Sequence, residues 1–164
     1  MHLLTKSNRG NNYLKATEAN KHRMNKNQNQ TAVRVNTSEE DYDWSQYTIL
    51  IAEDEETNFI YLETALIKTK VNVIRAKNGR EAVDAAKVNP VIDLILMDIK
   101  MPEMNGLEAT RSIKTFRKDV PIIAQTAFAM DEDKQNCTAV GCDDFLAKPI
   151  RYTVLLDTLA KYLK

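Results

Sequence analysis

The stretch Leu94-Ile-Leu-Met-Asp98-Ile-Lys-Met-Pro102-Glu-Met-Asn105-Gly106 carries the strongest fold signal in the chain. Its four apolar residues lead directly into an acid, and a proline and an Asn-Gly pair then interrupt the chain. A short apolar run that ends in turn residues is typical of a strand buried on both faces of a parallel sheet. We therefore expect Asp98 at the carboxyl end of a central strand, where open α/β sheets bind ligands.

Short apolar segments and helical patterns alternate along the chain from Thr48 onward. We expect strands at residues 49–52, 71–74, 94–97, 120–124 and 145–147, and helices at residues 56–68, 81–88, 106–116, 128–138 and 152–163. Strands that alternate with helices predict a parallel sheet with right-handed crossovers and helices on both faces. The predicted fold class is a doubly wound α/β domain with a five-stranded parallel sheet.

Helical spacing of the apolar residues predicts which sides of the helices face the core. The residues expected to face inward are Phe59, Leu62, Leu66 and Ile67 in the first helix, Leu107, Ile113 and Phe116 in the third, and Tyr152, Leu155, Leu156, Leu159 and Leu163 in the last.

Residues 1–46 differ in composition from the rest of the chain. They are rich in Asn, Gln, Lys, Arg and Thr, and they contain few large apolar residues. Such a segment cannot bury enough surface to offset the entropy lost on ordering. We expect a flexible extension or linker at 1–46 and one domain at 47–164, with Trp44 and Tyr47 marking where packing begins. The basic residues of the extension could form a nucleic-acid arm, but neither aromatic interleaving nor a recognition helix supports this.

Composition argues against several classes of function. The formal net charge is +0, so no overall field attracts the chain to nucleic acid or to a membrane. No apolar run reaches the ~18 residues of a membrane span, and the start lacks a signal-peptide core, so we expect a cytoplasmic location. Cys137 and Cys142 have no histidine near them, which argues against a zinc site.

Polar residues stand at or just after the ends of four predicted strands: Glu53 and Asp54, Asp98, Thr126 and Lys148. Any one of them alone could be a helix cap or a turn residue. Parallel strands bring their carboxyl ends to one edge of the sheet, and so we expect all five side chains to converge there.

Three carboxylates in one site repel one another, by about 4 kcal/mol per pair at ~4 Å and an effective dielectric of ~20. Either some are protonated or a cation lies among them, and oxygen ligands with room for water suit Mg²⁺. A bound Mg²⁺ favours a phosphoryl group, which Lys148 and Thr126 could contact. Asp98 is then the candidate nucleophile, and it would form an aspartyl phosphate.

These residues resemble the receiver domains of two-component response regulators. The resemblance covers about residues 48–164 and rests on Ile49-Leu-Ile-Ala-Glu-Asp-Glu55, Leu96-Met-Asp-Ile-Lys-Met-Pro-Glu-Met-Asn-Gly106, Ala124-Gln-Thr-Ala127 and Phe145-Leu-Ala-Lys-Pro149. It implies a flavodoxin-like fold with strand order 2-1-3-4-5 and five helices. Residues 124–130 are most similar to receivers of hybrid sensor histidine kinases, although the chain lacks ATP-binding glycine boxes and a phosphoacceptor-histidine segment.

The resemblance also implies roles for the residues at the metal and the phosphoacceptor. Asp98 would accept phosphate from a histidine kinase or a histidine phosphotransfer domain. Mg²⁺ would be held by Asp98, by Asp54 directly, by Glu53 more through water, and by the backbone carbonyl of Lys100. Glu53 stands where Asp is commoner in the family, which is expected to alter the metal affinity without abolishing binding.

Further residues would carry the response to phosphorylation. Thr126 and Lys148 would contact the phosphoryl group, and the Lys148-Pro149 peptide is expected to be cis. Thr126 and Phe145 would form the switch, with Phe145 moving into space that Thr126 vacates. The fourth helix, fifth strand and fifth helix would transmit the change as a partner face or homodimer face. Lys100 and Phe128 would overhang the phosphoryl group and set its lifetime.

Other functions remain possible from the sequence. A phosphorylation-independent interaction module, or pseudo-receiver, would keep the fold without the chemistry. A phosphoaspartate hydrolase usually has a second Asp two residues after the nucleophile, where this chain has Lys100. A dinucleotide-binding domain needs a glycine-rich first turn, which residues 53–57 do not offer. We expect a regulatory phosphoacceptor that assists its own phosphorylation and dephosphorylation, not a dedicated enzyme, and no output domain for transcription.

Overall fold

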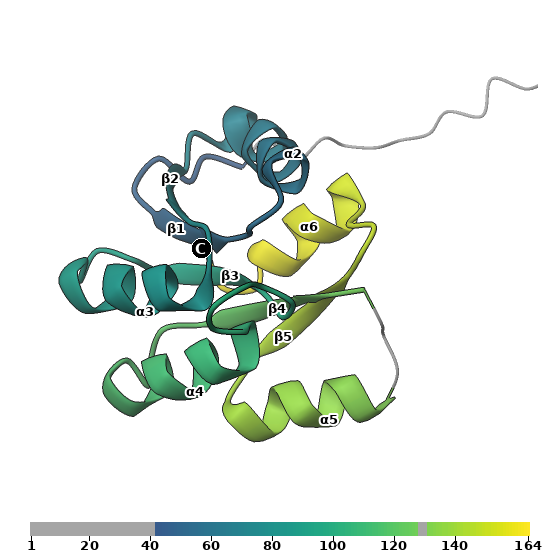
Figure 1. The fold of residues 1–164 in the computed structure, drawn as a ribbon. Helices are drawn as coiled ribbons and strands as arrows, with labels where there is room; N and C mark the ends of the chain where they lie inside the picture. The colour runs from purple at the N-terminus through teal and green to yellow at the C-terminus, as the bar shows by residue number, and fades with distance from the viewer. Residues whose placement is uncertain (1–41, 128–130) are drawn as a thin grey trace, which may run out of the picture. The chain divides into compact units, whose positions relative to one another are not determined.

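The computed structural model describes residues 42–127 and 131–164, without the side chains of 131–133. Its strands are β1 (Thr48–Ala52), β2 (Asn72–Ala76), β3 (Leu94–Asp98), β4 (Ile122–Thr126) and β5 (Asp144–Ala147). Its helices are α2 (Glu56–Leu66), α3 (Gly79–Val88), α4 (Gly106–Phe116), α5 (Asp131–Val140) and α6 (Tyr152–Leu159), with a 3-10 turn, η1 (Ile67–Thr69), after α2 (Figure 1). None of the described helices has both the length and the apolar character needed to cross a membrane.

The strands form one parallel sheet in the order β2-β1-β3-β4-β5. This confirms the predicted doubly wound sheet and its strand order. Every residue of β3 and β4 is buried, as a strand covered on both faces requires. The second strand lies at an edge, in agreement with its weaker apolar pattern. Asp98 is therefore the last residue of the central strand.

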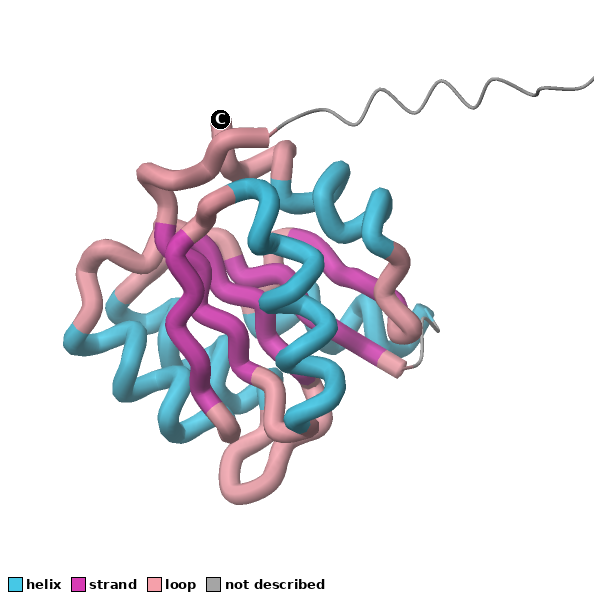
Figure 2. The backbone as a smooth tube through the Cα atoms, turned by 90° about the horizontal axis from the view of Figure 1, so that it is seen from above, coloured by secondary structure: helices cyan, strands magenta, loops and turns pink. Residues whose placement is uncertain are grey.

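Different helices cover the two faces of the sheet (Figures 1 and 2). Successive strand residues point to opposite faces, so Ile123 packs with α2 and α6, while Ile122 packs with α3 and α4. The α2/α6 side has a core of large residues that includes Trp44, Phe59 and several leucines. The α3/α4 side relies on small helical residues, Ala82, Ala86 and Ala109 among them.

Two asparagines determine where α3 and α4 begin. The Asn78 side chain accepts a hydrogen bond from the Glu81 N–H (2.8 Å), and so α3 starts at Gly79, two residues before the predicted start. Asn105 and Glu108 form a reciprocal capping box at the start of α4, whose bounds agree with the prediction.

Three side chains expected to face inward are exposed instead. Ile67 is 66% exposed, because the chain tightens into η1 after Leu66 and leaves the period of the α-helix. Phe116 (40% exposed) is the last residue of α4, where the Lys87 ammonium lies 5.9 Å from its ring centroid. Tyr152 (40% exposed) is the first residue of α6. Leu107 is half-buried, and the remaining residues expected to face inward are buried.

The described chain already packs against the domain at its start. Trp44 is buried, its N–H donates to the Thr69 carbonyl (2.7 Å), and the Tyr42 ring stacks on it with centroids 4.7 Å apart. Tyr47 packs against the same core. The expectation for the extension falls mostly on residues 1–41, which lie outside the described residues, and it stays a prediction.

Candidate functional site

The sheet brings the predicted polar residues to the carboxyl ends of its strands. Glu53 and Asp54 directly follow β1, Asp98 ends β3, Thr126 ends β4 and Lys148 directly follows β5. β1, β3 and β4 are neighbours in the sheet, so the residues that follow them lie close together. The edge where they meet is the usual ligand-binding edge of a doubly wound sheet.

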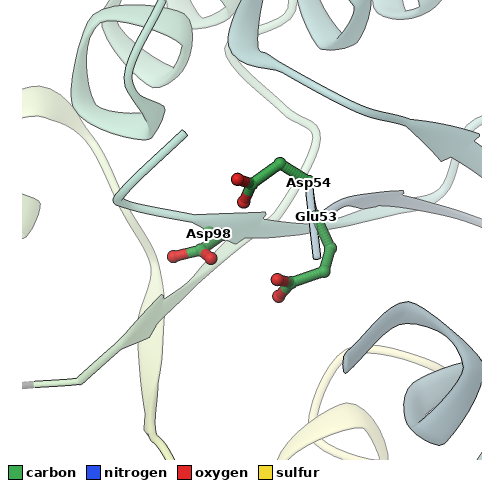
Figure 3. A group of neighbouring side chains, drawn as sticks. All are labelled: Glu53, Asp54 and Asp98. Carbon is green, nitrogen blue, oxygen red and sulfur yellow. The ribbon is translucent and has the colours of Figure 1, made fainter. Parts of the chain in front are cut away.

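The three acids form a compact cluster (Figure 3). One carboxylate oxygen from each of Glu53, Asp54 and Asp98 lies within 4.8 Å of the others. Figure 3 shows Glu53 and Asp54 reaching the cluster from β1, and Asp98 reaching it from β3. Glu53 is fully buried and Asp98 is 6% exposed, whereas Asp54 is only half-buried. The cluster therefore joins two carboxyl groups that are shielded from water to one that water can reach.

Lys148, which directly follows β5, bonds to two of these acids. Its ammonium donates to Glu53 Oε2 (2.7 Å) and to Asp98 Oδ2 (2.5 Å). Burial alone would lower the pKa of Lys148, but the hydrogen bonds from its ammonium to Asp98 and Glu53 outweigh burial and raise this pKa. Lys148 is therefore a fixed cation beside the acidic cluster.

Glu53 is the most perturbed acid of the cluster. Burial raises the pKa of its carboxyl above the ordinary 4.5, and the charge of Asp98 acts in the same direction. Hydrogen bonds from Lys148 and from Asn58 Nδ2 (3.0 Å to Oε1) oppose this rise without cancelling it. An additional cation near Glu53 would favour its ionised form.

The backbone after β3 holds Asp98 in place. The Lys100 N–H donates to Asp98 Oδ1 (3.0 Å), the Ile99 N–H to the Gln125 carbonyl (3.1 Å) and the Gly106 N–H to the Ile99 carbonyl (3.0 Å). A Cβ atom on Gly106 would lie 2.0 Å from the Asp98 carbonyl oxygen. Only glycine allows α4 to start this close to the end of β3.

Residues predicted to act with Asp98 lie on β4, β5 and the loop after β5. Thr126 is buried, and its carbonyl accepts a hydrogen bond from the Lys148 N–H (2.7 Å). Phe145 is 36% exposed, with the Lys134 ammonium 4.8 Å from its ring centroid. The Lys148-Pro149 peptide is cis. The predicted roles of Thr126, Phe145 and the Lys100 carbonyl stay predictions, and Phe128 lies outside the described residues.

Two residues near the site were not singled out from the sequence. Asn58 donates to Glu53 from the first turn of α2, and only the fold brings these residues together. Gln125 lies within the quoted motif at residues 124–127. The sequence of an apolar run does not show which atoms will surround an amide inside it. Gln125 is fully buried on β4.

The cluster fits a hard divalent cation. When all the groups are ionised, three carboxylates and one ammonium give the site a net charge of two negative units. The atoms that the three acids offer as metal ligands are all oxygens. Carboxylate oxygens with a solvent-accessible side suit Mg²⁺, which keeps several of its waters. Fold and site together define a doubly wound α/β domain with an acidic cluster around one central-strand aspartate.

Comparison with known proteins places this domain in a family. The family model described as the response regulator receiver domain matches residues 49–160. The polar-differentiation response regulator DivK of Brucella anthropi is 37% identical over 118 residues, which cover 71% of this chain and 95% of DivK. The chain therefore belongs to the response regulator receiver family, and it is a receiver domain of two-component signalling.

Solved structures agree with this assignment. The receiver domain of Saccharomyces cerevisiae Ssk1, crystallised with the histidine phosphotransfer protein Ypd1, matches with a TM-score of 0.69 and 32% identity over 72% of this chain and 89% of that one. The receiver domain of sensor histidine kinase PA1611 from Pseudomonas aeruginosa matches with a TM-score of 0.67 and 35% identity, over 71% and 97% of the two chains. The latter has a magnesium ion coordinated in its active-site cleft.

Proposed function

We propose that Asp98 accepts a phosphoryl group from a phosphohistidine and thereby switches an interaction surface of this domain. The observation that carries the proposal is the pairing of Lys148 with both Asp98 and Glu53 inside a cluster of three acids. A buried ion cluster of this kind is costly for stability alone, and it resembles a site arranged for charge that arrives later.

Asp54, Glu53 and Asp98 would hold Mg²⁺ together with the Lys100 carbonyl. The PA1611 receiver, which has a magnesium ion coordinated in its active-site cleft, supports this choice of ion. The metal would supply positive charge that offsets the negative charge of the carboxylates and of the phosphoryl group. Asp54 is the accessible acid and suits a direct ligand, while Glu53 is held by Lys148 and Asn58 and suits an indirect one.

In the transfer step a carboxylate oxygen of Asp98 forms a bond to phosphorus as the bond from phosphorus to the histidine nitrogen breaks. The electron pair stays on the imidazole, which takes up a proton from water. The Lys100 N–H orients the Asp98 carboxylate by donating to Oδ1. The Lys148 ammonium, which donates to Oδ2, could donate instead to a phosphoryl oxygen after transfer. Thr126 would hydrogen-bond another phosphoryl oxygen.

The donor would be a histidine kinase or a histidine phosphotransfer domain, in the manner of the Ssk1 receiver with Ypd1. The domain would act as a regulatory phosphoacceptor in the cytoplasm, and not as a dedicated enzyme. Movement of Thr126 and Phe145 would alter the surface of α5, β5 and α6, which could also form a homodimer face.

Incubation with acetyl phosphate and Mg²⁺, followed by intact mass spectrometry, tests the proposal. Wild-type protein should gain the mass of one phosphoryl group, and Asp98→Asn protein should gain none. Asp84→Asn is the matched control, because Asp84 is an exposed acid on α3. An unmodified wild-type protein would favour the pseudo-receiver alternative, and a modified Asp98→Asn protein would exclude Asp98 as the acceptor.

A further inference from the structure

A pocket of about 360 Å³ lies between the first turns of α2 and the segment that joins β5 to α6. Tyr61 and Leu62 line it from α2, and Pro149 and Ile150 line it from the joining segment. The Tyr61 hydroxyl donates to the Ile150 carbonyl (2.7 Å) and ties these two walls together. The volume is in the range of small-molecule sites, which are mostly apolar with a few placed polar groups.

Gln125 supplies an unpaired polar group to this pocket. Gln125 is one of the residues that line the pocket, on β4 and on the same face of the sheet as Ile123, and it is 0% exposed. Within the described part of the chain, neither Oε1 nor Nε2 of Gln125 has a hydrogen-bond partner. Buried side-chain amides are nearly always hydrogen-bonded, so an unpaired one that faces a pocket indicates a site for a ligand.

The Lys148 ammonium and the Asn58 amide, which line the pocket, are already engaged with the acidic cluster. The Lys148 ammonium is bonded to Glu53 and Asp98, and the Asn58 amide donates to Glu53. A charged ligand would therefore have to break contacts of the acidic cluster to find a counter-charge in this pocket. A neutral ligand needs only the amide of Gln125 and the apolar walls.

We propose that this pocket binds a small, flat, neutral molecule that carries a cyclic amide. A primary carboxamide presents an acceptor and a donor side by side, and a cyclic amide presents its N–H and C=O on the same side. The two can form a pair of hydrogen bonds, while the rest of the ligand packs between Tyr61, Leu62 and Ile150. Binding at this site does not require phosphorylation of Asp98.

Titration of the ¹⁵N-labelled, unphosphorylated 164-residue protein with 2-quinolinone tests the proposal. The side-chain NH₂ signals of Gln125 should shift and saturate with Kd on the order of 1 mM, a typical affinity for so small a ligand. The side-chain NH₂ signals of Gln135, which is exposed on α5, should stay unchanged and serve as an internal control.

N-methyl-2-quinolinone is the matched ligand, because a methyl group replaces its N–H donor. It should bind wild-type protein about tenfold more weakly, and Gln125→Leu protein should bind 2-quinolinone about tenfold more weakly, which corresponds to the loss of one or two neutral hydrogen bonds. Equal affinity for the two quinolinones would overturn the proposal, as would an absence of shifts at Gln125. The ligand comparison uses wild-type protein only, so it holds even if the Gln125→Leu protein fails to fold.

Discussion

The two faces of the sheet differ in how closely they are packed. On the α3/α4 face, a Cβ on Gly79 would lie 2.4 Å from the Met104 carbonyl oxygen, and one on Gly106 would lie 2.0 Å from that of Asp98. On the α2/α6 face, large side chains from Trp44 to Leu163 form the core, and a pocket of about 360 Å³ remains beside Gln125 and Lys148. One face excludes a single methyl group, whereas the other has room for a small molecule.

Asp98 therefore lies between a closely packed region, at the start of α4, and a face of the sheet that contains a pocket. Close packing at the start of α4 holds the backbone of the proposed phosphoacceptor, and productive geometry in phosphoryl transfer depends on such positioning. The looser face carries Lys148, which reaches from the wall of the pocket to Glu53 and Asp98. Lys148 and Asn58 thus both line the pocket and donate hydrogen bonds to the acidic cluster.

Gly106→Ala should disrupt the close packing at the start of α4 and cause the largest loss of stability among the variants. The added methyl would overlap the Asp98 carbonyl, and we expect a loss of about 3 kcal/mol in the free energy of unfolding by urea. Thr64→Ala, on the exposed side of α2, is the control and should change stability by less than about 0.5 kcal/mol. Equal stability of the two variants would show that the start of α4 is not closely constrained.

Lys148→Met should remove the ion pairs that link the pocket wall to the acidic cluster. We expect the free energy of unfolding to fall by about 2 kcal/mol near neutral pH, because two buried carboxylates lose their cation. The pKa of Glu53 is already raised by burial, and this variant should raise it further. Stability from such a group is fully present below its ordinary pKa of 4.5 and is lost as pH rises through the raised pKa.

The loss caused by Lys148→Met should therefore shrink as pH falls through the raised pKa of Glu53, and unfolding curves between pH 4 and 8 measure it. Added Mg²⁺ should restore part of the stability at neutral pH. Lys161→Met provides the matched control, because Lys161 pairs with Asp144 at the surface. A loss that does not depend on pH would contradict the assignment of the effect to Glu53.

Gln125→Leu should give the smallest change, in the opposite direction. Replacing a buried amide that lacks a protein partner with an apolar side chain should raise the free energy of unfolding by about 1 kcal/mol. Gln46→Leu, at an exposed position, should leave it unchanged. Destabilisation by Gln125→Leu would show that the amide makes favourable hydrogen bonds in the unliganded protein.

The sheet and its acidic edge were predictable because their signals are local and repeated. Apolar runs such as residues 94–97 end in polar residues, and parallel pairing then gathers Glu53, Asp98 and Lys148 at one edge. The order of the strands followed from the resemblance to receivers, because periodicity does not specify which strands are neighbours.

The errors and omissions have physical causes. Ile67 and Phe116 lie where a helix tightens or ends, so a constant helical period misplaces their side chains. Asn58 acts on Glu53 through a turn whose geometry sequence spacing does not specify. The unpaired state of Gln125 depends on what surrounds it in three dimensions, and no sequence pattern reports the absence of a partner.

The most direct test of the central claim is to locate the phosphoryl group chemically. Protein treated with acetyl phosphate and Mg²⁺ is reduced with borohydride, which converts an aspartyl phosphate to homoserine, and its peptides are sequenced by tandem mass spectrometry. Our account predicts homoserine at position 98. Homoserine at Asp54 or at another aspartate, with Asp98 intact, would contradict it.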